Sequence, residues 1–236
     1  MSVSNPKTFV LVHGAWHGGW CWRRVAERLR AHGHVVYTPT LTGVGERSHL
    51  LSPDIDLDLQ ITDVVNVMKW DDLTDVVLVG HSYGGFVISG VAERMEQSIS
   101  SIVYLDAFLP ENGEALADNW SPERARQLAE DAAAGIPASP VPVAYYHVNE
   151  QDQAWVDSKC TPHPPKCFLQ PIKLTGARNR IARKTYVYAD AWPSHFTPFY
   201  EKARRDSSWR TATIPCGHEV MIDMPERTAE ILEEAA

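Results

Sequence analysis

The sequence is poor in cysteine, has no excess of basic residues and begins without a long apolar segment. Four cysteines in 236 residues are too few for a disulfide framework, so we expect reduced thiols and a cytoplasmic protein. The N-terminal apolar run, 9–12, is far too short for a signal peptide or a membrane span, and we expect no membrane partner. The net charge of −8 argues against a nucleic-acid partner, because a phosphate backbone needs a basic face.

What the sequence does contain is a regular alternation of short β-rich runs and amphipathic stretches, typical of parallel strands joined by crossover helices. The near-continuous apolar runs suit a sheet covered on both faces. The predicted strands are 8–12, 34–38, 76–79, 101–105, 185–189 and 210–214. The predicted helices are 20–31, 57–69, 84–96, 196–206 and a last helix from Pro225. We therefore expect a single α/β domain over 1–236, with a mostly parallel sheet of about six strands flanked by helices.

One long segment, 111–183, breaks this alternation. It contains an acidic helix-like piece at 121–134 and the proline-rich stretch "CTPHPPKCFLQPIKL". An insertion of this length after the strand that ends near Leu105 predicts a cap or lid over a site, within the same domain.

The stretch "VLVGHSYGGFVISG" contains Gly80-His81-Ser82-Tyr83-Gly84, which fits the pattern G-x-S-x-G. An isolated match is more often a glycine-rich turn with an incidental serine. Here a predicted strand precedes the match and a predicted helix follows it, which favours a nucleophile on a sharp strand-to-helix turn. The turn needs glycines because its backbone is strained and the helix passes close to the strand.

A nucleophilic serine needs a base and a site for the negative charge that develops on the substrate. His218 lies in "IPCGHEVMIDMP", between the last strand and the last helix, and is the favoured base. His195 is a weaker rival, because it lies at the start of a helix pattern. The backbone N–H groups of Tyr83 and of Ala15, in "HGAWHGGW", are the expected oxyanion donors.

Three motifs, "FVLVHGAWHGGWCW", "VLVGHSYGG" and "GHEVMIDMPE", resemble the α/β-hydrolase superfamily. The resemblance is to bacterial carboxylesterases related to the plant methylesterase and hydroxynitrile lyase branch. It covers nearly the whole chain and matches the inserted segment only loosely. It implies the α/β-hydrolase fold and a triad in the order serine, acid, histidine, with Ser82 attacking an acyl carbon and His218 moving the proton.

The resemblance leaves two candidates for the acid. Asp190 follows the strand 185–189 at a distance from His218 that resembles the plant enzymes. Asp106 ends "SIVYLDAF", next to the nucleophile's strand, and "YLDAFLP" resembles the bacterial carboxylesterases. An aspartate buried at the end of an apolar strand needs a partner. We favour Asp106 and keep Asp190 as the alternative.

The chemistry expected from these residues is ester hydrolysis. The related lyases have threonine where this chain has Gly14, and lysine directly after the catalytic histidine, where this chain has Glu219. A negative charge at that position would repel cyanide. Dehalogenases and epoxide hydrolases use an aspartate as nucleophile, whereas position 82 is serine. Two alternatives stay open: a hydroxynitrile lyase-like C–C lyase, and a non-catalytic small-molecule receptor on the same fold.

Aromatic residues near the predicted site indicate a small to medium, largely apolar ester as the partner molecule. Trp16, Phe108 and Trp192 are the expected substrate-binding residues. Besides this small molecule, we allow for a homodimer.

We expect no metal and no cofactor. Cys160, His163 and Cys167, in "CTPHPPKC", lack a fourth ligand and the usual zinc spacing. The glycines of "LTGVGERSH" have neither the P-loop nor the Rossmann spacing, so no nucleotide is expected.

Overall fold

The computed structural model describes residues 6–236. The expectation about the N-terminal stretch therefore falls in part on residues 1–5, outside the described residues. The described chain forms a six-stranded, all-parallel sheet with the order β2-β1-β3-β4-β5-β6. The strands are β1 (Thr8–Val12), β2 (Val35–Tyr37), β3 (Val76–His81), β4 (Ile99–Leu105), β5 (Arg183–Ala189) and β6 (Arg210–Ile214). Each predicted strand is present, and a sheet predicted to be mostly parallel is parallel throughout.

Helices fill the crossovers where the sequence predicts them. The longer helices outside the insertion are α1 (Arg23–Ala31), α2 (Leu57–Trp70), α3 (Gly84–Met95), α8 (Thr197–Arg205) and α10 (Pro225–Glu234). The shorter ones are η1 (Gly19–Trp22), η2 (Gly45–Leu50), η3 (Glu96–Ser98) and α9 (Val220–Asp223). The helix predicted over 20–31 is thus a short 3-10 turn followed by α1.

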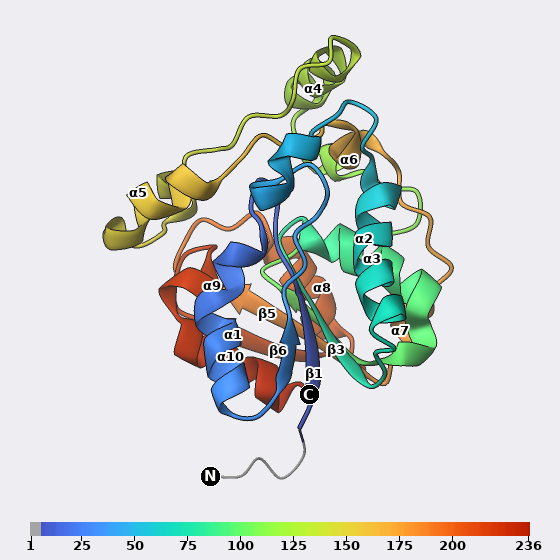
Figure 1. The fold of residues 1–236 in the computed structure, drawn as a ribbon, viewed down its shortest axis with the longest axis vertical. Helices are drawn as coiled ribbons and strands as arrows, with labels where there is room; N and C mark the ends of the chain where they lie inside the picture. Colours follow the sequence, from blue (N-terminus) through green and yellow to red (C-terminus); the bar gives the residue numbers. More distant parts are fainter. Residues whose placement is uncertain (1–5) are drawn as a thin grey trace.

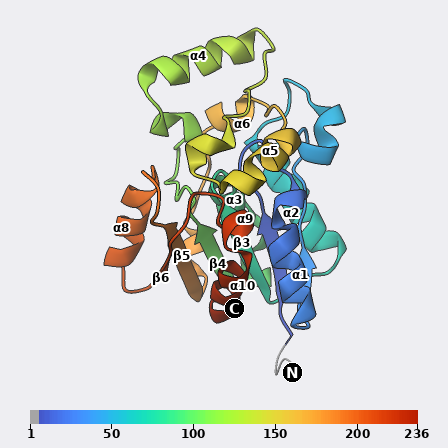
Figure 2. The same ribbon diagram turned by 90° about the vertical axis from the view of Figure 1, so that its left-hand side faces the viewer.

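Both faces of the sheet are covered, as Figures 1 and 2 show. Val10 and Leu78 face the layer that holds α2 and α3, whereas their neighbours Phe9 and Val77 face the layer that holds α1 and α10. Successive residues of a strand point to opposite faces, so a sheet buried on both sides needs apolar residues at every position. This explains the near-continuous apolar runs of the sequence.

Between β4 and β5 the described chain forms short helices and loops and a single β-bridge, between Ala138 and His163. We call residues 111–183 the inserted segment. Its helices are η4 (Leu116–Asn119), α4 (Pro122–Ala133), η5 (Val143–Tyr146), α5 (Glu150–Lys159), α6 (Lys166–Leu169) and α7 (Ala177–Arg180). Figures 1 and 2 show α4, α5 and α6 beyond the end of the sheet toward which β1 runs, and α7 beside α3.

The start of α3 lies so close to the sheet that only glycine fits there. A Cβ atom on Gly84 would lie 2.9 Å from the carbonyl oxygens of Val12 and His13, and one on Gly85 would lie 2.0 Å from the carbonyl oxygen of Phe108. Real Cβ atoms do not approach backbone so closely, so the strand-to-helix turn depends on these glycines.

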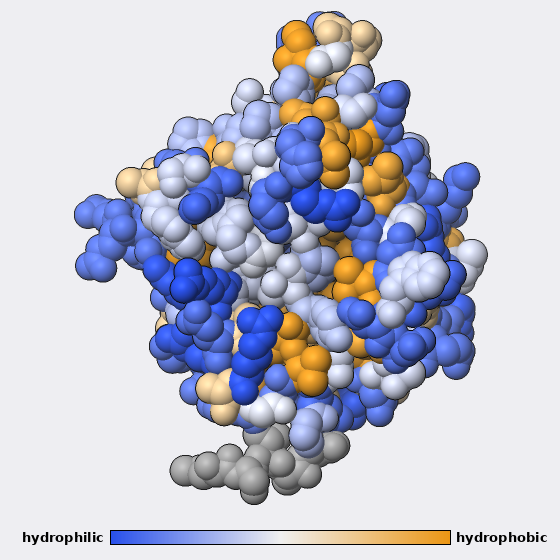
Figure 3. Space-filling view, viewed as in Figure 1, coloured by the Kyte–Doolittle hydropathy of each residue, from blue (hydrophilic) through white to orange (hydrophobic). Residues whose placement is uncertain are grey.

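Hydrophilic residues cover most of the face drawn in Figure 3, and apolar residues show in small groups among them. Within residues 6–236, no helix has both the length and the apolar composition needed to cross a membrane. The four cysteines all have free thiols. The cytoplasmic location stays a prediction.

Candidate active site

Three of the predicted site residues have a backbone conformation that L-amino acids rarely adopt. Ser82 has a φ of +54°, Asp106 of +42° and Trp16 of +65°, and they are half of the six non-glycine residues with positive φ in the described chain. Such a residue costs on the order of 1–3 kcal/mol and persists only where its surroundings hold it. The Ser82 carbonyl oxygen is held by N–H groups of Gly85 and Phe108, at 3.0 and 3.2 Å. The strain therefore marks the turn that presents Ser82.

The structure pairs His218 with Asp106. The two side chains are hydrogen-bonded from Nδ1 to Oδ2 at 2.7 Å, and Asp106 is fully buried. Trp192 Nε1–H also donates to Oδ2, at 3.2 Å, and the Ala189 N–H donates to Oδ1, at 3.3 Å. Burial raises the pKa of Asp106, and these hydrogen bonds oppose that rise. Asp190 is exposed at the end of β5, where its N–H donates to the Ile214 carbonyl oxygen.

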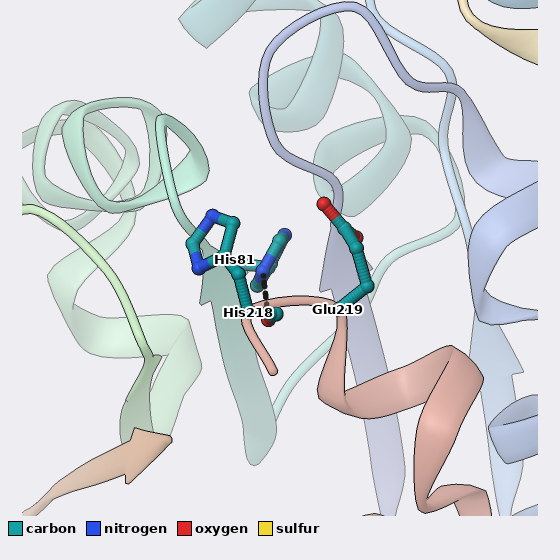
Figure 4. A group of neighbouring side chains, drawn as sticks. All are labelled: His81, His218 and Glu219. Atoms are coloured by element: carbon teal, nitrogen blue, oxygen red, sulfur yellow. Dashed lines mark hydrogen bonds between the residues drawn. The ribbon is translucent and has the colours of Figure 1, made fainter. Parts of the chain in front are cut away.

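The loop that holds His218 is fixed by its backbone as well as by its ring. The His218 N–H donates to the Tyr146 carbonyl oxygen at 2.9 Å. His81 Nε2–H donates to the His218 carbonyl oxygen at 3.0 Å, the dashed line in Figure 4. Burial lowers the pKa of His81 well below its usual range, which keeps that ring neutral. The ring of Phe196 stacks on that of His218, with the ring centroids 4.9 Å apart. The imidazole of His218 is thus held in one orientation.

A cavity of about 700 Å³ opens above Ser82 and His218. Ala15 and Tyr83 also line it, and so do the three predicted substrate-binding residues, Trp16, Phe108 and Trp192. The inserted segment supplies a large part of the wall, including Leu116, Trp120, Tyr146 and Phe168. Half of the lining residues are phenylalanine, tyrosine or tryptophan.

Two contacts of cavity-lining residues have no signal in the sequence. Arg124, on α4, lies with its guanidinium carbon 4.0 Å from the ring centre of Trp120. His195, the rival base, is exposed, and its Nε2 is hydrogen-bonded to the Tyr145 hydroxyl at 2.8 Å. Neither contact follows from local sequence, because each joins segments that are placed only by the fold.

The region beside Ser82 offers backbone donors. Within residues 6–236, the N–H groups of Ala15 and Tyr83 donate no hydrogen bond to another protein group, and the Ser82 hydroxyl makes none. A hydroxyl without a hydrogen bond is compatible with a nucleophile, because the bond between a nucleophile and its base often tightens only when substrate binds. A Cβ atom on Gly14 would lie 2.9 Å from the Cβ of Ser82. Glycine at position 14 therefore lets the loop after β1 approach the serine.

A buried ion pair joins this loop to the loop of His218. His17 Nε2 lies 3.5 Å from Glu219 Oε2, and both side chains are almost wholly buried. Burial alone lowers the pKa of His17, but the Glu219 carboxylate, together with Cys160 at 3.9 Å, outweighs it and raises that pKa to about 10. His17 is therefore a cation at neutral pH.

The cysteines and histidine of "CTPHPPKC" point to separate partners. Cys160 faces His17, His163 Nδ1 accepts from the Trp16 N–H, and Cys167 Sγ donates to the Ile55 carbonyl oxygen at 3.7 Å. The three side chains therefore contact different parts of the fold, and the expected absence of a metal stays a prediction.

Another group in the described chain brings three potential ligand atoms within reach of one ion: His81, His218 and Glu219 (Figure 4). His81 is bonded to the His218 carbonyl, His218 to Asp106, and Glu219 faces His17. His81 Nδ1 and Glu219 Oε2 are buried and have no hydrogen-bond partner among the described residues, whereas His218 Nδ1 is occupied by Asp106.

Comparison with known proteins agrees with this geometry. A family model described as "Alpha/beta hydrolase family" matches residues 9–231.

The chain belongs to the alpha/beta hydrolase family.

Two of the similar proteins are named as esterases. A carbendazim hydrolyzing esterase of Nocardioides sp. is 42% identical over 236 residues, covering 95% of this chain and 97% of that protein. Methylesterase 4 of Arabidopsis thaliana is 36% identical over 114 residues, covering 47% of this chain and 43% of that protein. This hydrolase is accordingly an enzyme of the carboxylic ester hydrolase class, as predicted.

A solved structure extends the likeness to the whole fold. An extracellular alpha/beta-hydrolase from a Paenibacillus species is 26% identical, with a TM-score of 0.84 over 98% of this chain and 99% of that chain. It is described as sharing structural and functional homology with tobacco salicylic acid binding protein 2. The superimposable length includes the inserted segment, which the motifs match only loosely.

The buried ion pair predicts a pH dependence of stability in this hydrolase. Because the pKa of His17 is raised from 6.5 to about 10, the pair stabilises the fold fully below pH 6.5, and this stabilisation is lost as the pH rises toward 10. Glu219→Gln should lower the free energy of unfolding by about 3–5 kcal/mol at pH 7, the usual cost of removing one partner of a buried pair. The difference from wild type should shrink between pH 7 and pH 10 in denaturant titrations.

Glu27→Gln provides the control, because the Arg23–Glu27 pair is exposed and should contribute little at any pH. A Glu219→Gln deficit that stays constant from pH 7 to pH 10 would contradict the assigned charge of His17.

Proposed function

We propose that this hydrolase cleaves small to medium, largely apolar carboxylic esters through an acyl-enzyme on Ser82, with His218 as base and Asp106 as the acid that orients it. The observation that most supports this is the 2.7 Å hydrogen bond between His218 Nδ1 and the buried Asp106, beneath a cavity that Ser82 also lines. Since Asp106 occupies Nδ1, Nε2 is the nitrogen left to face the substrate.

In the first half-reaction, His218 Nε2 takes the hydroxyl proton as Ser82 Oγ bonds to the ester carbonyl carbon. The backbone N–H groups of Ala15 and Tyr83 stabilise the resulting oxyanion. The carbon–oxygen bond to the alcohol then breaks, and His218 gives its proton to that alcohol. In the second half-reaction, water attacks the acyl-enzyme by the same steps, releasing the acid and restoring Ser82.

The volume and lining of the cavity support an ester with an aromatic or apolar portion. We propose that the inserted segment acts as a lid within a single domain, because its aromatic residues form part of the cavity wall. The Nocardioides relative is named for carbendazim hydrolysis, so carbendazim is a substrate to assay beside simple esters. A homodimer stays a prediction.

Two positions support ester hydrolysis over cyanohydrin cleavage. A threonine in place of Gly14 would collide with Ser82, because even a bare Cβ would come within 2.9 Å of the serine's Cβ. Glu219 pairs with His17, so the position where the lyases have a lysine holds a buried carboxylate.

Ser82→Ala should abolish ester hydrolysis, since it removes the hydroxyl that forms the proposed acyl-enzyme. We expect kcat on p-nitrophenyl esters to fall by about 10⁵–10⁶-fold. A series from acetate to decanoate would also give the chain length that fits the cavity. Activity that survives in Ser82→Ala would refute the nucleophile, and no activity in wild type would favour a receptor or a lyase.

The acid can be tested by a matched pair of variants. Asp106→Asn should lower kcat by about 10⁴-fold, because the amide no longer holds the tautomer of His218 that leaves Nε2 free to accept a proton. Asp190→Asn should stay near wild type, since Asp190 is exposed. Steady-state kinetics of both variants distinguish the two candidate acids. A large loss of kcat in Asp190→Asn, with Asp106→Asn near wild type, would assign the role of the acid to Asp190.

A further inference from the structure

The residue directly after Ala15 is clamped by the inserted segment. The Trp16 N–H donates to His163 Nδ1 at 3.2 Å, and its indole N–H donates to the Ala138 carbonyl oxygen at 3.1 Å. The Trp16 carbonyl oxygen accepts from the N–H of Thr161 at 2.9 Å. The positive φ of Trp16 needs such external support.

The peptide plane between Ala15 and Trp16 is held at both of its polar atoms. His17 Nδ1 is hydrogen-bonded to the Ala15 carbonyl oxygen at 2.8 Å. On the other edge of the plane, His163 Nδ1 accepts a hydrogen bond from the Trp16 N–H. The direction of the Ala15 N–H depends on this plane, because the two are separated only by the rotations about the Ala15 Cα.

The second nitrogen of His163 leads to Tyr83. A backbone N–H can only donate, so Nδ1 of His163 is the acceptor and Nε2 has the proton. His163 Nε2–H donates to Gln60 Oε1 at 3.3 Å, and the Tyr83 hydroxyl donates to the same oxygen at 2.7 Å. The amide of Gln60 is oriented by its Nε2, which donates to the Thr42 carbonyl oxygen at 3.0 Å. A continuous chain of hydrogen bonds thus joins the two sides of the proposed oxyanion hole.

The residues of this hydrogen-bond chain are completely buried: His163, Gln60 and Tyr83 are all 0% exposed. The ring of His163 stacks on Phe168, with centroids 4.6 Å apart, and meets Tyr83 edge-on at 5.1 Å. Burial also lowers the pKa of His163 well below its usual range, consistent with a neutral ring that donates on one side and accepts on the other. No water is needed to complete the bonds of His163.

We propose that His163 is a positioning residue for ester hydrolysis: together with Gln60, it holds the Ala15 and Tyr83 amides at the separation that the oxyanion requires. The inference rests on the proposed function. Oxyanion donors act through preorganisation, within about 3 Å of an atom that becomes charged only during the reaction. The hydrogen-bond chain should therefore change the stability of the transition state far more than that of the bound ester.

His163→Phe removes both hydrogen bonds and keeps an aromatic ring. We expect kcat to fall by about 10–100-fold with KM within about threefold of wild type, the pattern of a misplaced catalytic group. His163→Asn should recover most of this loss, because its amide oxygen can accept from the Trp16 N–H. Val156→Ala serves as the control: Val156 is fully buried in the same segment, and this change should lower stability without lowering kcat.

Two matched inhibitors separate positioning from general loosening of the fold. Trifluoroacetophenone adds to Ser82 as a tetrahedral hemiketal whose oxygen needs the oxyanion hole, whereas acetophenone binds only as a ground-state ketone. His163→Phe should weaken inhibition by trifluoroacetophenone about 10–100-fold and leave that by acetophenone within about twofold. Equal weakening of both, or unchanged kcat, would overturn the proposal.

Tyr83→Phe is a second test if His163→Phe does not fold. It deletes only the hydroxyl that donates to Gln60 at the other end of the hydrogen-bond chain. It should lower kcat and trifluoroacetophenone affinity together, by about 3–10-fold, and unchanged values would contradict the proposal. A wild-type protein without Ser82-dependent hydrolysis would instead overturn the proposed function, and this inference with it. Ser82-dependent hydrolysis that is indifferent to both variants would overturn the positioning role alone.

Discussion

The hydrogen bond between Asp106 and His218 is the constraint around which the site is organised. A fully buried carboxylate is costly unless it is paired and hydrogen-bonded. Asp106, at the end of β4, meets this condition because His218, the indole of Trp192 and the N–H of Ala189 converge on it. The parallel sheet provides that convergence, since the carboxyl ends of its strands lie along one edge.

Much of this arrangement could be predicted from the sequence, because it depends on local patterns. The central strands β1, β3 and β4 follow from near-continuous apolar runs, which a sheet covered on both faces requires. The edge strand β6 is largely exposed and follows from its β-branched residues. Ser82 follows from glycines that allow α3 to approach the sheet, and their need is visible in the contact that a Cβ on Gly85 would make. The choice between Asp106 and Asp190 could not be decided locally, because both end a strand and only one is buried against His218.

The contacts of the inserted segment could not be predicted from the sequence, because they join residues far apart in the chain through single hydrogen bonds. The sequence around His163 suggests only a metal ligand, yet His163 contacts Trp16 and Gln60, each more than one hundred positions away. Nothing in "CTPHPPKC" encodes those partners. The segment that forms the cavity wall also braces the loop after β1, so changes in it should alter turnover as well as substrate choice.

The most direct test of the account is covalent labelling with a p-nitrophenyl alkylphosphonate, followed by mass spectrometry of peptides. Only a serine activated by a base, beside an oxyanion hole, reacts readily with such a reagent. We expect one phosphonate on the peptide that contains Ser82, and no label in His218→Ala. Labelling at another residue, or equal labelling of Ser82 without His218, would contradict it.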